Sequence, residues 1–288
     1  MLRTLRNFPS KFVAERDIHI WLPEQYHSLA AQGQEFATLY MHDGQMLFDR
    51  STTWNQQEWQ VDEVSQNLIS NNEVRPFIVV GINNGGDNLR YPEYMPQKPH
   101  AALSAKMQQN IKNGLALQAP IQSDAYLQFI VKELKPYIDQ HYQTSKLRHD
   151  TLLAGASMGG LISWYAVAEY PDVFGGCLCM STHFIGGPDL HDDKIFNVFK
   201  NYMANKLPVN GSHFLYFDYG DQTLDQYYPP FHKKLSKFLN KQNANPKTVF
   251  VSFFPGDAHD EIAWQKRLPQ ALKKALNTKL KMSLTTTH

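Results

Sequence analysis

The sequence of 288 residues predicts an α/β fold with a mainly parallel central sheet and helices on both faces. Short apolar segments alternate along the chain with longer segments whose apolar residues recur at helical spacing. Strands that alternate with helices form parallel sheets covered on both sides. The chain shows no internal repeat and no clear linker, so we expect a single domain over residues 1–288.

Seven segments have the composition of strands. The segment 16–23 (RDIHIWLP) alternates apolar and polar residues, and the others are mostly short apolar runs, typical of strands buried on both faces. The expected strands are 16–23, 36–43, 77–83, 150–156, 174–181, 213–220 and 247–255.

Six segments have helical periodicity. In 58–69, for example, Trp59, Val61, Val64 and Leu68 fall on one face, and Asp124 is a plausible N-cap for 124–142. The expected helices are 58–69, 124–142, 158–170, 192–205, 227–242 and 260–276. Pro269 is expected to kink the last of them.

The stretch 83–118 is the least regular part of the chain. It follows a predicted strand and is rich in Pro, Gly and Asn. Long irregular segments inside a compact domain commonly carry function. We therefore expect a long loop insertion here, close to the active site.

Composition and charge exclude several classes of partner. Lys and Arg total 28 against 27 Asp and Glu, for a net charge of +1, which gives no indication of a nucleic-acid partner. No run of about 18 apolar residues indicates a membrane partner. The N-terminal segment lacks a signal-peptide pattern, so we expect a cytoplasmic location, with a processed periplasmic form as the alternative. The sequence does not predict an oligomeric state.

The two cysteines, Cys177 and Cys179, lie two residues apart in an expected strand. They should face the same side of the sheet as buried free thiols. A zinc or redox role is the weaker interpretation, because a zinc site usually needs a second pair of ligands. We predict no metal and no organic cofactor.

The segment GASMG, residues 155–159, matches the pattern G-x-S-x-G between an expected strand and an expected helix. That context is typical of a nucleophile elbow, in which a sharp turn exposes the serine hydroxyl above the sheet edge of an α/β-hydrolase fold. Ser157 is the candidate nucleophile. The amide of Met158, at the start of the helix, can stabilise an oxyanion. A capping serine in a glycine-rich turn is the alternative.

A serine nucleophile needs a base and an acid, which follow it along the chain in this fold. His259 lies between the last expected strand and the last expected helix, where the base belongs. Asp218, Asp221 and Asp225 lie at the end of one strand, the first within it and the other two in the following loop. The spacing does not choose between Asp221 and Asp225.

Five segments together resemble the Putative esterase family, the branch of the α/β-hydrolases that includes esterase D, feruloyl and acetyl-xylan esterases, enterochelin esterases and mycolyltransferases. The segments are LYMHDGQMLFD (39–49), RYPEYMP (90–96), GASMGGL (155–161), YGDQTLD (219–225) and HDEIAWQKRL (259–268). The resemblance implies that Asp225 is the triad acid, with Asp221 in reserve. It also implies that the amide of Gln45, directly after the Asp-Gly pair, is the second oxyanion donor.

Further residues are candidates to line a substrate pocket. Trp54 and His183 follow strand ends on the expected active-site side, although Trp54 fits the core equally well. In RYPEYMP, Arg90 and Glu93 are expected to pair with each other and order their loop. The candidate pocket residues are Asp43, Trp54, Arg90, Tyr94 and His183.

These residues predict a serine esterase that cleaves a small-molecule or carbohydrate-linked carboxylic ester through an acyl-enzyme. The resemblance spans several substrate classes, so the sequence does not identify the acyl or alcohol group. An acyltransferase with the same triad is the first alternative. A binding protein on a hydrolase fold is the second, and it is disfavoured because nucleophile, histidine and acid candidates are all present.

Overall fold

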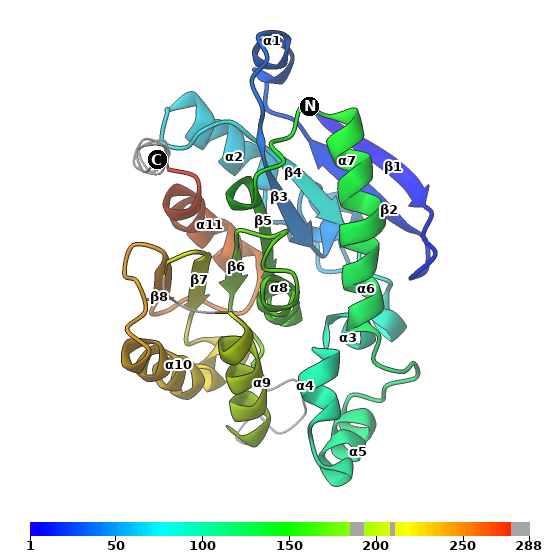
Figure 1. Ribbon diagram of the computed structural model, residues 1–288, viewed down its shortest axis with the longest axis vertical. Helices are drawn as coiled ribbons and strands as arrows, with labels where there is room; N and C mark the ends of the chain where they lie inside the picture. The colour runs from blue at the N-terminus through cyan, green and yellow to red at the C-terminus, as the bar shows by residue number, and fades with distance from the viewer. Residues whose placement is uncertain (185–192, 208–210, 278–288) are drawn as a thin grey trace.

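The computed structural model describes residues 1–184, 193–207 and 211–277 and contains one eight-stranded sheet with helices on both sides (Figure 1). The spatial order of its strands is β1-β2-β4-β3-β5-β6-β7-β8. The strands are β1 (Leu2–Phe8), β2 (Arg16–Trp21), β3 (Ala37–His42), β4 (Phe77–Ile82), β5 (Thr151–Ala156), β6 (Gly176–Met180), β7 (Phe214–Tyr219) and β8 (Val249–Phe253).

The six strands β3 to β8 run parallel to one another, whereas β2 is antiparallel to both β1 and β4. The carboxyl ends of β3, β5, β6, β7 and β8 therefore meet at one edge of the sheet. In parallel sheets this edge is where ligands bind. The fold is the predicted α/β-hydrolase arrangement.

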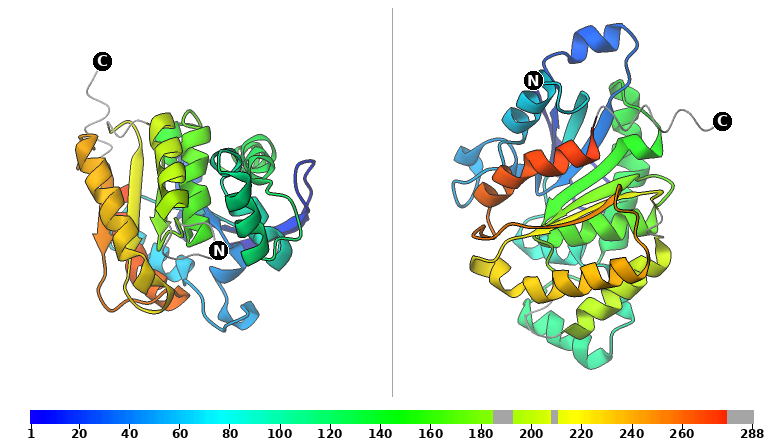
Figure 2. Two further views of the ribbon diagram at one scale, coloured as in Figure 1. Left: turned by 90° about the horizontal axis from the view of Figure 1, so that it is seen from below. Right: turned by 90° about the vertical axis from the view of Figure 1, so that its left-hand side faces the viewer.

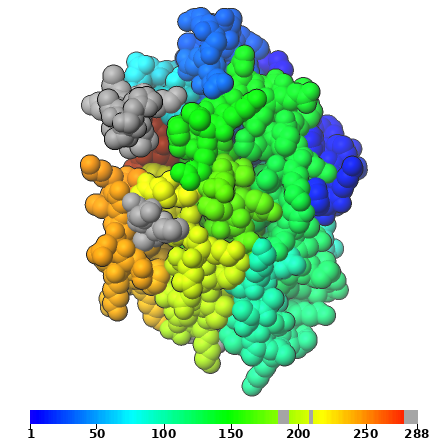
Figure 3. Space-filling model, viewed as in Figure 1, coloured from blue at the N-terminus to red at the C-terminus, as the bar shows by residue number. Residues whose placement is uncertain are grey.

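The helices divide between the two faces of the sheet (Figure 2). They are α1 (Tyr26–Ala31), α2 (Val61–Ser70), α3 (Asp87–Tyr94), α4 (Gln97–Ala101), α5 (Ala105–Gly114), α6 (Ser123–Phe129), α7 (Lys135–His141), α8 (Met158–Glu169), α9 (Asp193–Lys206), α10 (Pro229–Lys241) and α11 (Glu261–Ala275). One core cluster contains α2 and α11, and the other contains α6 and α8 to α10. Strand residues alternate between the clusters, as in a sheet buried on both faces. The space-filling view shows α9 and α4 side by side on one surface of the molecule (Figure 3).

Several short turns complete the chain. They are the 3₁₀ turns η1 (Gly44–Met46), η2 (Arg50–Thr52), η4 (Arg148–Asp150) and η5 (Thr223–Tyr227), and the π-helical turn η3 (Ile130–Leu134). The predicted helix 124–142 is thus α6 and α7 joined through η3. Pro269 lies inside α11, which continues through it to Ala275.

The sequence did not predict β1. Its side chains are exposed or half-buried, and Asn7 has a left-handed φ of 46° beside an irregularity in the pairing with β2. An edge strand of this kind is stabilised mainly by backbone pairing with its neighbour, so its own apolar pattern is weak.

The expected long loop at 83–118 was wrong in its secondary structure, because the stretch contains α3, α4 and α5. Its Pro and Gly residues separate short helices without preventing them. Pro92 lies within α3, and Ser104 caps α5 by accepting a hydrogen bond from the Met107 amide. The helix α3 packs against α6 and α8. The candidate nucleophile Ser157 directly precedes α8.

The cysteines are buried free thiols on the same face of β6, as predicted. Their sulfur atoms lie 3.4 Å apart, and burial raises the pKa of the Cys179 thiol well above its ordinary value. Both thiols therefore act as small apolar side chains in the core.

Candidate active site

Ser157 occupies a strained turn between β5 and α8. Its backbone has φ 57° and ψ −122°, a conformation that residues other than glycine rarely adopt. A Cβ atom at Gly155 would lie 2.6 Å from the backbone carbon of Gly159, so only glycine allows the chain to fold back so closely. This geometry is that of a nucleophile elbow.

His259 and Asp225 form a hydrogen bond of 2.7 Å between Nδ1 and Oδ1. Asp225 lies in η5 after β7 and is fully buried, while His259 lies in the loop between β8 and α11. The His259 amide donates to Thr223 Oγ1 at 2.8 Å, which ties the two loops together. A neutral His259 that donates from Nδ1 keeps Nε2 as an acceptor, as a general base requires.

Tyr228 joins this pair to the serine. Its ring packs edge-on against the His259 ring at 5.5 Å, and its hydroxyl contacts the side chain of Ser157. The same hydroxyl hydrogen-bonds Nδ1 of His183 at 2.7 Å. The sequence analysis missed Tyr228; its position three residues after Asp225 was the only available signal.

Asp221 does not contact His259 among the described residues. It is half-buried, and its Oδ1 accepts hydrogen bonds from the Gly256 amide at 2.8 Å and from Gln222 Nε2 at 2.9 Å. The Gln222 and Gly256 hydrogen bonds lower the pKa of Asp221. Asp221 thus connects the loops after β7 and β8, whereas Asp225 is the carboxylate that hydrogen-bonds His259.

A buried polar network surrounds Asp225. Its Oδ2 accepts hydrogen bonds of 2.6 Å from the Gly220 amide and from Ser181 Oγ. Ser181 Oγ in turn accepts from Trp264 Nε1 at 3.0 Å and from Arg267 Nη2 at 2.7 Å. Both Trp264 and Arg267 come from α11, so the last helix fixes the position of the acid.

A second buried carboxylate lies next to this network. Asp218 Oδ1 accepts from the Ser181 amide at 3.2 Å, and its Oδ2 accepts from the Tyr216 hydroxyl at 3.1 Å. Burial raises the pKa of Asp218 to about 6, although Arg267 acts in the opposite direction. The sequence analysis had placed Asp218 within the strand, and it is the penultimate residue of β7.

The two candidate oxyanion donors lie in loops that touch. A Cβ atom at Gly159 would be 3.4 Å from Asp43 Oδ2 and from His42 Cβ, so the loop after β3 packs on the first turn of α8. Within the described parts of the chain, neither the Met158 amide nor the Gln45 amide donates a hydrogen bond. Free amides such as that of Met158, at the start of α8, and that of Gln45, in η1, suit a developing negative charge.

The sequence profile of the family described as Putative esterase matches residues 10–275. The chain belongs to the Putative esterase family. The five segments that suggested this resemblance all fall within the matched region.

Two curated relatives come from Bacillus subtilis (strain 168). Uncharacterized protein YjcH is 26% identical over 157 residues, which cover 53% of this chain and 60% of the relative. Uncharacterized protein YbbA is 25% identical over 160 residues, which cover 56% of this chain and 54% of the relative. The matches thus span little more than half of each relative, and neither name states an activity.

Solved structures of esterases share the fold. A ferulic acid esterase superposes with a TM-score of 0.67 at 18% identity, covering 96% of this chain and 98% of its own. An IroE-like serine hydrolase from Shewanella oneidensis gives 0.67 at 20%, covering 95% and 79%. The enterobactin esterase FES from Shigella flexneri gives 0.62 at 17%, covering 96% and 59%. At these identities the likeness establishes the fold alone.

Three pocket candidates of this family member lie together. Arg90 donates from Nε and Nη2 to the two carboxylate oxygens of Asp43, each at 2.8 Å. The Asp43 amide donates to the Tyr94 hydroxyl at 3.2 Å. The expected Arg90–Glu93 pair is wrong: Glu93 is buried and receives two hydrogen bonds from Arg16, because α3 turns residues 90 and 93 toward different neighbours.

The other two pocket candidates differ in exposure. His183 is buried and lies beside Tyr228, so it supports the wall next to Ser157. The side chain of Trp54 is 86% exposed and is therefore not a core residue. Its neighbour Asn55 donates to Glu261 Oε2 at 2.8 Å, which ties this loop to the start of α11, two residues after His259.

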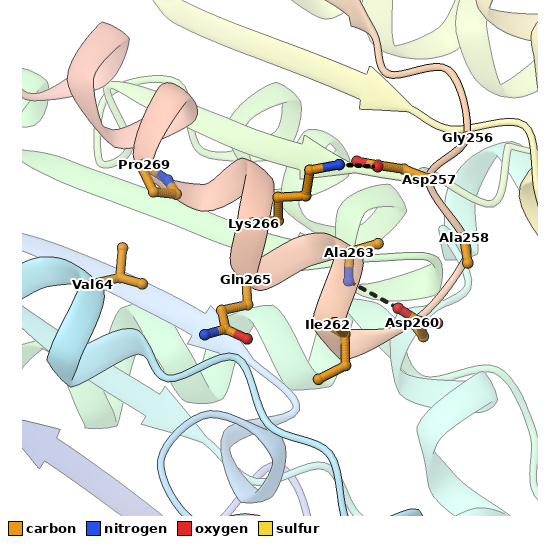
Figure 4. Close-up of a pocket in the computed structure, with 10 residues that line it drawn as sticks. All are labelled: Val64, Gly256, Asp257, Ala258, Asp260, Ile262, Ala263, Gln265, Lys266 and Pro269. Atoms are coloured by element: carbon orange, nitrogen blue, oxygen red, sulfur yellow. Dashed lines mark hydrogen bonds and ion pairs between the residues drawn. The ribbon is translucent and has the colours of Figure 1, made fainter.

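A depression lies beside α11 and is also lined by Val64 of the neighbouring helix α2 (Figure 4). Its lining includes Asp257, Asp260 and Lys266, but neither Ser157 nor His259. Within it, Lys266 pairs with Asp257 at 2.6 Å, and Asp260 caps α11 by accepting from the Ala263 amide. These partners hold the loop that carries His259.

The described residues contain neither a metal-binding cluster nor a membrane-spanning helix. Residues 1–184, 193–207 and 211–277 contain no group of three or more His, Cys, Asp and Glu side chains arranged to hold a metal ion. Over the same ranges, no helix is both long and apolar enough to cross a membrane.

Proposed function

We propose that the protein hydrolyses carboxylic esters through the triad Ser157, His259 and Asp225. The observation that carries this proposal is the 2.7 Å hydrogen bond between His259 and the buried Asp225, at the sheet edge where Ser157 stands in a strained elbow. A surface histidine or a capping serine would need neither feature.

In the first step His259 Nε2 takes the proton of Ser157 while Oγ attacks the carbonyl carbon of the ester. The carbonyl oxygen becomes negatively charged, and the amides of Met158 and Gln45 stabilise it. His259 then gives its proton to the leaving alcohol as the carbon–oxygen bond breaks, which leaves an acyl group on Ser157. Asp225 holds the imidazole in the required tautomer and stabilises its charged form.

In the second step water replaces the alcohol. His259 takes a proton from water, whose oxygen attacks the acyl carbon, and then returns the proton to Ser157 Oγ as the acid is released. An acyltransferase would differ only in the use of another hydroxyl at this point. We favour water because the matched family is described as an esterase family.

The substrate is proposed to be a small-molecule or carbohydrate-linked ester. Its support is Trp54, whose exposed indole near the start of α11 offers a flat apolar surface to an aromatic or sugar ring. A cytoplasmic location stays a prediction from the sequence.

The test is hydrolysis of p-nitrophenyl acetate by the wild type and by Ser157→Ala. We expect kcat to fall by about 10⁴–10⁶ with unchanged thermal unfolding. A fluorophosphonate should label the wild type on Ser157 and leave the variant unlabelled. Ser163→Ala removes a buried hydroxyl from the same helix and should keep most activity. Hydrolysis by Ser157→Ala close to the wild-type rate would refute the proposal.

A further inference from the structure

Asp43 has a left-handed backbone conformation, and its carboxylate lies close to the start of α8. It has a left-handed φ of 56° at the end of β3, which bends the chain into η1 and sets the direction of the Gln45 amide. For a residue other than glycine this conformation is strained and persists only where neighbours enforce it.

The carboxylate of Asp43 lies against the start of α8. Its Oδ2 is 3.4 Å from the position that a Cβ of Gly159, the second residue of that helix, would occupy. The N-terminal end of a helix is positive and favours a bound anion. A carboxylate without a nearby positive charge would occupy the positive end of α8 in place of the oxyanion, and its own charge would repel an oxyanion formed at Ser157.

Arg90 compensates this charge directly. Its guanidinium donates two hydrogen bonds of 2.8 Å to the two oxygens of Asp43, and Asn84 Nδ2 adds a third of 2.6 Å. Burial acts to raise the pKa of Asp43, but the charge of Arg90 and these hydrogen bonds hold it below its ordinary value. Asp43 is therefore ionised at neutral pH and depends on Arg90.

The surrounding contacts fix the same turn. The Asp43 amide donates to the Tyr94 hydroxyl, and the Asn84 amide donates to Gln45 Oε1 at 3.2 Å. A Cβ at Gly44 would lie 2.7 Å from the backbone of Gly81, so the turn is pressed against β4. Arg90 and Tyr94 both belong to α3, which thus braces the loop from one side.

We propose that Arg90 is a positioning residue of the oxyanion hole: it neutralises Asp43 beside the helix terminus and holds the left-handed turn that directs the Gln45 amide. The inference rests on the proposed function. It gives the insertion at 83–118 a role in the chemical step, separate from any contact with substrate. The competing role, a clamp for an anionic substrate, would act on KM and only with charged esters.

The test is a double-mutant cycle on a neutral ester, p-nitrophenyl acetate, with Arg90→Gln, Asp43→Asn and the double variant. We expect Arg90→Gln to lower kcat by about 10- to 100-fold with KM within about threefold, because the loss falls on transition-state charge. Asp43→Asn alone should cost less. The double variant should recover about tenfold in kcat over Arg90→Gln, because the amide at position 43 carries no charge to repel the oxyanion.

Two further variants separate charge from geometry. Arg90→Lys keeps the charge but loses the two-pronged hydrogen bond, so its kcat should lie between those of the wild type and Arg90→Gln. Arg6→Gln removes an arginine from the exposed Arg6–Asp17 pair and should leave kcat unchanged. If Arg90→Gln does not fold, we expect the double variant to fold again, because it also lacks the charge of Asp43. In that case Arg90→Lys carries the kinetic test, and its kcat should lie within about tenfold of the wild type.

The outcomes distinguish this inference from the proposed function. If Ser157→Ala abolishes hydrolysis while the double variant is no faster than Arg90→Gln, the inference fails and the triad stands. A loss confined to KM, or seen only with anionic esters, assigns Arg90 to substrate binding and also overturns it. If Ser157→Ala keeps its activity, the proposed function fails first.

Discussion

Each side of the candidate site places a carboxylate near an arginine, Asp43 near Arg90 and Asp225 near Arg267, and the two sides arrange the pair in opposite ways. On the oxyanion side, Arg90 grips both oxygens of Asp43 directly at 2.8 Å. On the acid side, Arg267 Nη1 stays 3.8 Å from Asp225 Oδ2, and Ser181 lies between them, accepting from Arg267 and donating to Asp225.

The difference fits the roles that we propose for the two carboxylates. The two hydrogen bonds from Arg90 occupy Asp43 and spread its charge into an ion pair, which suits a group that must not compete with an oxyanion. Asp225 keeps Oδ1 for His259, because Ser181 and the Gly220 amide bind only Oδ2. A direct arginine clamp on Asp225 would weaken its hold on the imidazole.

The largest effect should come from removing the charge of the acid. Asp225→Asn should lower kcat by about 10⁴ at neutral pH, because the amide favours the wrong tautomer of His259. Asp221→Asn is the matched control, because Asp221 lies in the same loop but is only half-buried and bonds to Gly256 and Gln222; its kcat should stay within about threefold of the wild type. Ester hydrolysis measures kcat, and circular dichroism confirms folding.

The opposite result would reassign the acid. A crippled Asp221→Asn beside a near-normal Asp225→Asn would mean that the loop after β7 adopts another path in the working enzyme. Mild losses in both variants would leave the reaction to Ser157 and His259, and the buried hydrogen bond to Asp225 would be structural.

The next effect concerns stability and compares the two arginines. Arg267 is fully buried near three carboxylates, so Arg267→Met should lower the free energy of unfolding by about 3–5 kcal/mol. The side chain of Arg90 is 26% exposed and pairs with one carboxylate, so Arg90→Met should cost about 1–2 kcal/mol. Urea unfolding at pH 7 measures both, and equal losses would contradict the distinction between a buried and a rim arginine.

The candidate site was predictable where it is local. The elbow needs five consecutive residues, and Gly155 and Ser157 signal it because a tight strand-to-helix turn allows few other residues. The choice between Asp221 and Asp225 was not available from spacing, since it depends on burial beneath α11. Ser181 and Arg267 could not be predicted as site residues for the same reason. Their contact forms only when the end of β6 and α11, which are far apart in the sequence, come together in the fold.

The fold shows the same division. Strands buried on both faces, such as β4 and β5, consist almost wholly of apolar residues and are evident from the sequence. The edge strand β1 and the short helices α3 to α5 are not, because pairing and capping stabilise them more than their own periodicity does. The sequence therefore predicted the wrong partner for Arg90 and no partner for Tyr94, and both residues contact Asp43 from α3.

A buried histidine lies on each side of the candidate site, His42 on the oxyanion side and His232 on the acid side. The two differ in their hydrogen bonds. On the oxyanion side, His42 Nδ1 hydrogen-bonds the Tyr126 hydroxyl at 2.8 Å. On the acid side, His232 stacks on Tyr219 at 4.2 Å, and neither of its ring nitrogens hydrogen-bonds a described residue. Burial lowers the pKa of His42 to about 4 and that of His232 to about 3, from an ordinary value of 6.5.

The smallest predicted effect is a change in acid sensitivity. Both histidines stay neutral in the folded protein, whereas in the unfolded chain they take up protons as the pH falls below about 6.5. The free energy of unfolding therefore decreases toward pH 4 and below, by up to about 1.4 kcal/mol per pH unit for each histidine. His232→Phe loses no hydrogen bond, so it should match the wild type within about 1 kcal/mol at pH 7 and lose less stability by pH 4.5. His42→Phe should also lose less stability as the pH falls, but it should be about 1–3 kcal/mol less stable throughout, because the Tyr126 hydroxyl loses its buried hydrogen bond to His42. Urea unfolding at pH 7, 6, 5 and 4.5 separates these outcomes, and a His232→Phe variant as acid-labile as the wild type would show that His232 is not the neutral buried group described above.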